Sequence, residues 1–150
     1  MYRSGRMAVP LALAVGVLLA PQARAEEKAA EKKPVKLVKE WKGSVADADL
    51  AKDAPEYVAD AMSLEKLWKK WGVEGKAPEV DFKKEIVIVS TTVGSRLSLS
   101  AKLDDKGNLE VLGLATRDLA PGFRYVIATV SREGVKTVNG KEWKEAKDKE

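Results

Sequence analysis

The large hydrophobic residues between positions 63 and 72 follow the period of an α-helix. They recur at i, i+3, i+4 and i+7, which places them on one helical face: Leu64, Leu67, Trp68 and Trp71. Ser63 suits the N-cap position, and Gly72 can end the helix. The spacing therefore predicts a helix over Ser63–Trp71 whose tryptophan-rich face packs into the core.

Beyond Gly72 the hydrophobic positions follow the period of β-strands. Ile86–Val89 is continuously apolar, as in a strand that is covered on both faces. Leu97–Leu103 alternates apolar and polar residues, as in a strand with one wet face. The same pattern predicts four further strands: Val35–Val45, Leu109–Thr116, Phe123–Val130 and Val135–Val138.

The segments between the predicted strands are short. Asp104–Asn108 and Pro121-Gly122 have the composition of turns, Gly113 indicates a bulge, and Ala46–Pro55 is either a loop or a short helix. Short connections favour antiparallel neighbours. We therefore expect an α+β fold in which a curved antiparallel sheet, or a partly open β-barrel, is covered on its open side by one helix.

Residues Met1–Ala25 have the three parts of a cleavable secretory signal peptide. Arg3 and Arg6 make a positive start, Ala8–Ala20 is an almost unbroken apolar run, and Ala23-Arg24-Ala25 presents small residues for cleavage. The alternative is a membrane anchor, but the run is shorter than the roughly 20 residues that a spanning helix needs. We therefore expect a periplasmic or secreted protein with no membrane span after cleavage.

Three segments should follow the signal peptide. Glu26–Pro34 is charged and lacks large apolar residues, so we expect a flexible tether. Residues 35–140 are enough for a single domain with its own core. Lys141–Glu150 is a charged tail that we expect to fray.

Removal of the signal peptide would change the charge of the chain. The whole chain has 27 Lys and Arg residues against 23 Asp and Glu, a net charge of +4. Cleavage would remove Arg3, Arg6 and Arg24, which leaves 24 against 23, a net charge of +1. A nucleic-acid-binding domain needs a strongly basic patch, so we expect no nucleic-acid partner. Because the chain has no cysteine, packing rather than disulfides must stabilise the fold.

The sequence offers little for catalysis. With no histidine and no cysteine, the chain lacks the commonest general base, the thiolate nucleophile and the usual zinc ligands. Ser63–Lys66 matches Ser-x-x-Lys, but a helix cap explains Ser63 better. The oxygen ligands of Asp104–Glu110 fit no EF-hand spacing and are ordinary turn chemistry. We expect no enzyme, no metal and no cofactor, and a metal-independent hydrolase stays the weakest hypothesis.

The segment Thr116–Tyr125 has the composition of a contact surface, with arginine and aromatic residues at a loop-to-strand junction. Loops of alternate hairpins collect at one end of an antiparallel sheet, so we take four residues as candidate binding residues: Arg96, Arg117, Arg124 and Tyr125. Arg117 and Arg96 rank first and Tyr125 last, because Arg124 and Tyr125 are adjacent and point to opposite faces of a strand. The alternative is a structural role in which Asp118 pairs with an arginine.

The order of motifs along the chain is distinctive. Trp68 on a short helix is followed by Pro78–Phe82, by Ile86–Val89, by Gly94-Ser95-Arg96 and, after a hairpin, by Pro121-Gly122. Over roughly Met62–Val138 this order resembles the C-terminal domain of the PrcB family of exported bacterial proteins. The chain departs from the family after Gly94, where Arg-Leu-Ser-Leu-Ser replaces a Gly-Gly-aromatic segment. The family's namesake is associated with stabilising a secreted protease complex, so the resemblance implies protein binding rather than catalysis.

Two function classes follow from these observations. The first is a non-catalytic, exported interaction domain that binds or stabilises another envelope or secreted protein, such as a protease. The second is a small-ligand or glycan-binding module that uses exposed indole faces of Trp41, Trp68 or Trp71. The accessibility of the tryptophans distinguishes the two, and the sequence leaves the oligomeric state open.

Overall fold

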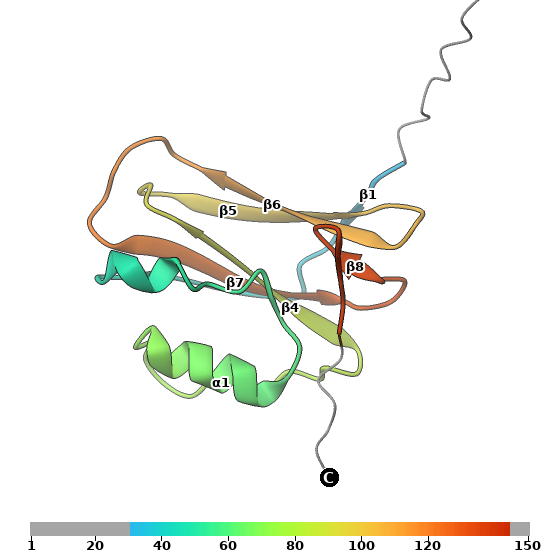
Figure 1. The fold of residues 1–150 in the computed structure, drawn as a ribbon, viewed down its shortest axis with the longest axis horizontal. Coiled ribbons are helices and arrows are strands. Elements are labelled where there is room, and N and C mark those ends of the chain that lie inside the picture. Colours follow the sequence, from blue (N-terminus) through green and yellow to red (C-terminus); the bar gives the residue numbers. More distant parts are fainter. Residues whose placement is uncertain (1–30, 145–150) are drawn as a thin grey trace, which may run out of the picture.

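The computed structural model describes residues 31–144, and the predicted signal peptide Met1–Ala25 lies outside this range. Two stacked sheets and one α-helix form the domain (Figure 1). The five-stranded sheet has the order β1 (Lys33–Val35), β5 (Leu97–Leu103), β6 (Asn108–Ala115), β8 (Thr137–Val138), β9 (Lys141–Glu142). The four-stranded sheet has the order β2 (Lys39–Val45), β7 (Phe123–Ser131), β4 (Glu85–Thr92), β3 (Tyr57–Val58). The predicted α+β class is confirmed, and the sheets of the described range are not closed into a barrel.

Antiparallel pairing dominates both sheets, as the short connections predict. The central pair of the four-stranded sheet, β4 and β7, runs in register from Glu85 opposite Ser131 to Thr92 opposite Arg124. Among the strands of residues 31–144, the pairing of β6 with β8 is the exception, because it is parallel. Two-residue β8 reaches β6 by way of the turn after β7, so chain order alone does not reveal this neighbour.

The helix α1 (Ala61–Lys70) begins two residues earlier than the sequence predicts. Asp60 is the N-cap, because its carboxylate accepts a hydrogen bond from the Ser63 amide at 2.7 Å. The Ser63 hydroxyl donates to the same carboxylate at 2.7 Å and lies inside the first turn. The chain between α1 and β2 holds a short 3-10 helix, η1 (Ala48–Ala51), which decides between the two alternatives for Ala46–Pro55.

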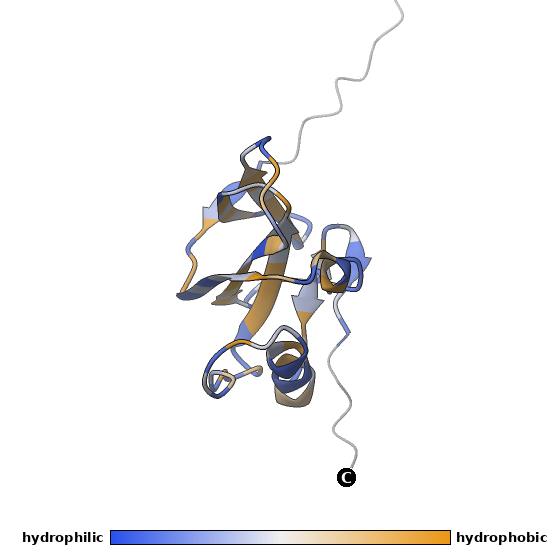
Figure 2. Cartoon of the chain, turned by 90° about the vertical axis from the view of Figure 1, so that its left-hand side faces the viewer, coloured by the Kyte–Doolittle hydropathy of each residue, from blue (hydrophilic) through white to orange (hydrophobic). Residues whose placement is uncertain are grey.

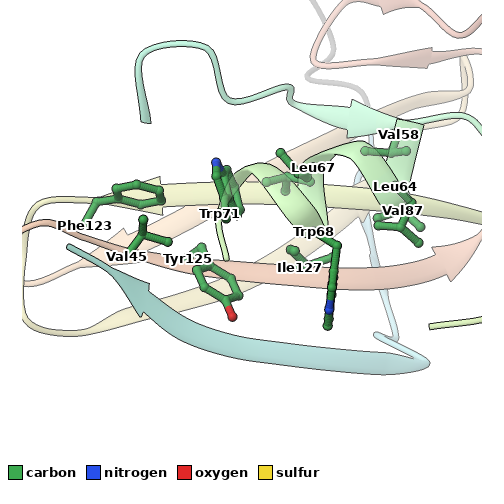
Figure 3. Packing of buried hydrophobic residues seen from close by; sticks show 11 residues of the cluster. Val45, Val58, Leu64, Leu67, Trp68, Trp71, Val87, Phe123, Tyr125 and Ile127 are labelled. Carbon is green, nitrogen blue, oxygen red and sulfur yellow. The ribbon is translucent and has the colours of Figure 1, made fainter. Parts of the chain in front are cut away.

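Two hydrophobic clusters lie on opposite faces of the four-stranded sheet. The cluster under α1 is rich in aromatic residues and includes Trp68, Trp71, Phe123 and Tyr125 (Figure 3). The cluster between the two sheets is mainly aliphatic and includes Ile86, Ile88, Leu97, Leu99, Leu109 and Val126. The hydrophobic central strands run through the middle of the molecule in Figure 2. The prediction that the helical tryptophan stripe is core is therefore confirmed.

Four local predictions need correction. The predicted strand Val35–Val45 is divided between two strands, β1 and β2, which belong to different sheets. Gly113 is not a bulge, because β5 and β6 pair without interruption and Gly113 lies opposite Leu99. Lys33 and Pro34 belong to β1 rather than to the predicted tether, because they pair with the last residues of β5. The predicted tail begins with β9, and Trp143 after it packs on Tyr57 with ring centroids 5.2 Å apart.

Within residues 31–144, no helix has the length and apolar character needed to cross a membrane.

Candidate functional site

A hollow of about 450 Å³ opens where the edges of the two sheets meet. On one side lies β2, the edge strand of the four-stranded sheet. On the other lies the first half of β5, which β1 leaves uncovered because β1 pairs only with Ala101–Leu103. Nine residues line this cationic hollow: Lys42, Gly43, Ser44, Ser95, Arg96, Leu97, Ser98, Arg124 and Tyr125.

Among residues 31–144, three cationic residues and no acidic one line the hollow. Lys42 comes from β2, Arg96 stands just before β5, and Arg124 comes from β7. The β2–β7 register puts Ser44 opposite Arg124, which brings strands far apart in sequence to the same wall. Lys42 also forms an ion pair with Glu40, and Arg124 Nη1 donates to the Pro121 carbonyl at 3.2 Å. The described residues of the lining therefore carry a net positive charge.

Hydrogen bonds to the neighbouring loop hold Arg96 in place. The Arg96 amide donates to Thr116 Oγ1 at 3.1 Å, and the Thr116 amide donates to the Arg96 carbonyl at 3.2 Å. The Ser95 amide donates to Asp118 Oδ1 at 3.0 Å. Hydrogen bonds from Ser95 and Thr116 hold the pKa of the Asp118 carboxyl well below its usual range. Asp118 thus fixes the segment that carries Arg96 and bonds to Ser95 rather than to an arginine.

Tyr125 is a buried residue in the wall of the hollow and does not present an exposed surface to a partner. Its side chain is buried, lies 5.2 Å from the Trp71 ring and faces Gly43 on β2. Only glycine fits at position 43, since a Cβ there would be 2.6 Å from Tyr125 Cζ. Burial raises the pKa of the Tyr125 phenol. Arg124 and Tyr125 nevertheless both line the hollow, because it lies at the end of the sheet edge.

The structure brings together three of the four candidate residues, namely Arg96, Arg124 and Tyr125, and not Arg117. Arg117 is exposed in the connection after β6. Sequence reasoning missed Lys42 and Ser44 of β2. The alternation around Trp41 and Gly43 puts Lys42 and Ser44 on one face of β2, and that signal could have found them.

The tryptophans offer little exposed indole surface to a ligand. Trp68 and Trp71 are only 5% and 4% exposed. Trp41 is half-buried and meets Trp68 edge to face at 6.2 Å. A second hollow of about 450 Å³ lies beside α1 and Gly75–Val80, and Trp68 contributes to its wall. These positions support a core role for Trp68 and Trp71.

The oxygen-rich turn after β5 uses its side chains to hold the hairpin. Asp104 Oδ1 accepts hydrogen bonds from the amides of Lys106 and Asn108, at 3.0 and 2.8 Å. Asn108 Oδ1 accepts from the Thr137 hydroxyl and the Gly140 amide, at 2.9 and 2.8 Å. Turn geometry therefore explains this cluster, and the described part of the chain shows no group of acidic residues arranged to bind a metal.

Comparison of the chain with family models, with curated proteins and with solved structures finds no match. The resemblance to the PrcB family therefore stays a prediction that rests on the motifs quoted above.

Proposed function

We propose that this chain is a non-catalytic, exported binding domain that recognises an acidic segment of another exported protein at the cationic hollow. The observation that carries the proposal is the convergence of Lys42, Arg96 and Arg124 on one hollow that no acidic residue of the described range lines. Arginine presents a planar fork of donors that binds carboxylates with charge-assisted hydrogen bonds. An acidic segment would therefore complement the hollow in both charge and hydrogen bonding.

An extended conformation of the bound segment fits the edge beside the hollow. The part of β5 before Ala101 has no strand partner on the β1 side within the described residues. A peptide added there would continue the line of β1 and gain main-chain hydrogen bonds from the sheet. Alternate side chains of such a peptide would enter the hollow. The resemblance to the PrcB family favours the same partner class, an envelope or secreted protein such as a protease.

A defined acidic peptide tests the proposal. A fluorescent peptide of alternating glutamate and alanine is titrated into the protein recovered from an exporting bacterial host, and binding is followed by anisotropy. We expect Arg96→Ala combined with Arg124→Ala to weaken binding by about ten-fold or more, because two charge-assisted contacts are lost. Raising the salt concentration should weaken the wild-type complex as well.

Arg117→Ala is the matched control, because Arg117 has the same charge but lies outside the lining. It should change the affinity by less than about three-fold, as expected for an exposed rim charge. Equal binding by the double variant and the wild type would contradict the proposed function. The glycan-binding alternative has less support, since Trp68 and Trp71 are buried.

A further inference from the structure

The second half of β6 is an open strand edge on the side away from the cationic hollow. β5 covers one side of β6 along its whole length, but β8 covers the other side only at Asn108 and Leu109. The next amide, that of Val111, donates to Asn139 Oδ1 at 2.8 Å. Within residues 31–144 no strand then pairs with β6 on that side from Leu112 onward.

The pairing pattern shows which backbone groups face this open edge. The Asp104 amide donates to the Asn108 carbonyl, and the Thr116 amide donates to the Arg96 carbonyl. Because antiparallel bonding alternates along a strand, the even-numbered residues of β6 bond to β5. Gly113 and Ala115 therefore direct their amides and carbonyls toward the open edge.

The side chains of this edge are apolar and uncharged. Leu112 and Leu114 are exposed on the outer face of the five-stranded sheet, Leu114 to 69%. From Val111 to Thr116 the chain carries no charge. A different edge strand, β2, carries Lys39 and Lys42, and such lysines discourage strand pairing. The β6 edge lacks this protection.

We propose that two copies of this chain pair antiparallel along β6, with the two-fold axis at Leu114. In this register Gly113 lies opposite Ala115 of the second copy, and the two residues exchange both main-chain hydrogen bonds. Leu114 lies opposite Leu114 of the second copy, a close pair that buries the most exposed leucine of the strand. The two five-stranded sheets then form one continuous sheet across an isologous interface.

Charge and hydrogen bonding select this partner and this register. In this antiparallel register Glu110 lies opposite Asp118 and next to Arg117 of the second copy. Asp118 Oδ1 already accepts a hydrogen bond from the Ser95 amide of its own chain at 3.0 Å, so Arg117 is the charged group that approaches Glu110 at each end. A parallel copy would bring like charges together. A register centred on Gly113 would need the Val111 amide, which Asn139 already occupies. Glu110 has one oxygen bound to Lys32 at 2.8 Å and a second one for the approaching guanidinium.

Single cysteines test the register directly, because the native chain has none. Leu114→Cys should form a disulfide-linked dimer on mild oxidation, since opposite non-hydrogen-bonded residues have Cα atoms about 4.5 Å apart. Leu112 lies opposite Thr116 of the second copy, so Leu112→Cys should form several-fold less disulfide-linked dimer than Leu114→Cys. Equal cross-linking of the two variants would overturn the proposed register.

Sedimentation of the protein recovered from an exporting host tests the dimer itself. The wild-type mass should rise toward that of two chains with increasing concentration, and Leu114→Lys should keep the mass of one chain. Met62→Lys is the control, because Met62 is 66% exposed on α1, away from β6. It should dimerise like the wild type. A wild type that stays at the mass of one chain, or a folded Leu114→Lys variant that still dimerises, would overturn the proposal.

Discussion

The two open sides of the β5–β6 hairpin present different chemistry to a partner. Beside β5, the open edge meets Lys42, Arg96 and Arg124 in the cationic hollow. Beside β6, the open edge has no charge between Glu110 and Arg117. Both edges have unpaired main-chain groups, so backbone geometry alone does not distinguish them. We therefore propose different partners for the two edges, an acidic segment beside β5 and a second copy beside β6.

The cationic hollow touches both hydrophobic clusters, whereas the β6 edge rests on one of them. Leu97, in the lining of the hollow, belongs to the aliphatic cluster. Tyr125 places the cationic hollow against the aromatic cluster under α1, together with Phe123 and Trp71. The β6 edge lies over the aliphatic cluster between the sheets, through Leu109 and Val111. Substitutions in the aromatic cluster can therefore damage the cationic hollow while the β6 edge is preserved. Three predictions test this difference, from the largest expected effect to the smallest.

Truncating Phe123 should have the largest effect and should damage the hollow. Phe123 is fully buried, and its ring lies 5.3 Å from that of Trp71. Phe123→Ala should lower the free energy of unfolding by about 3–5 kcal/mol, because it leaves a cavity beneath the start of β7. Urea denaturation measures the loss. Phe123→Leu, which keeps part of the buried volume, should lose clearly less; equal losses would mean that the ring is not packed as described.

Two glycines, one near each surface, should respond differently to alanine. Gly43→Ala brings a Cβ against the Tyr125 ring, and Gly113→Ala brings one to 2.5 Å from Ser90 Oγ. The rigid ring cannot move away, so Gly43→Ala should cost about 1–3 kcal/mol of stability. The Ser90 hydroxyl can rotate, so Gly113→Ala should cost less.

Second substitutions sharpen the test of the glycines. Ser90→Ala should rescue Gly113→Ala, since the Ser90 Cβ would be 3.7 Å from the new methyl group. Tyr125→Phe should leave most of the Gly43→Ala loss, because Cζ still lies 2.6 Å away. Thermal denaturation of the four variants measures both effects. If Tyr125→Phe fully restored the stability lost in Gly43→Ala, the clash would involve only the Tyr125 hydroxyl and not the ring.

Asp118 should give the smallest effect, one that depends on pH. Its carboxyl pKa is lowered in the folded protein by hydrogen bonds from Ser95 and Thr116. The folded state therefore favours the carboxylate, so its stabilisation is present at neutral pH and is lost as the pH falls below the ordinary carboxyl pKa of about 4. Asp118→Ala should be less stable than the wild type at neutral pH, and urea denaturation should show the difference shrinking in acid. A difference that stays constant with pH would contradict this assignment.

Sequence patterns predict the local elements well where one face of an element meets the core. The helical tryptophans and the alternation of Leu97–Leu103 each report such a face. The helix start was misplaced because Asp60 and Ser63 are both good caps, and the carboxylate of Asp60 takes the bond to the Ser63 amide. Gly113 looked like a bulge, whereas its missing Cβ makes room for Ser90 of β4, a neighbour that the pattern does not reveal.

The candidate site depends on pairings between distant segments, which the sequence does not show. Lys42 reaches the hollow only because β2 pairs with β7. Arg117 misses it because β6 ends at Ala115 and Arg117 follows in the exposed connection. The charged tail begins with a strand because Lys141 and Glu142 pair with β8, and the ring of Trp143 packs on that of Tyr57, far away in the sequence. Composition identified the arginines as candidate binding residues, and the strand topology determines which of them lie together at the cationic hollow.

Mapping the alternating glutamate–alanine peptide onto the protein by heteronuclear NMR tests the central claim most directly. The amide signals of Gly43, Ser44 and Ser98, which line the cationic hollow, should shift progressively as the peptide is added. The amides of Gly113 and Ala115, on the β6 edge, should not respond to the peptide. Shifts confined to the β6 edge, or no shifts at the hollow at peptide concentrations where anisotropy reports binding, would contradict the assignment of the cationic hollow as the site for an acidic partner.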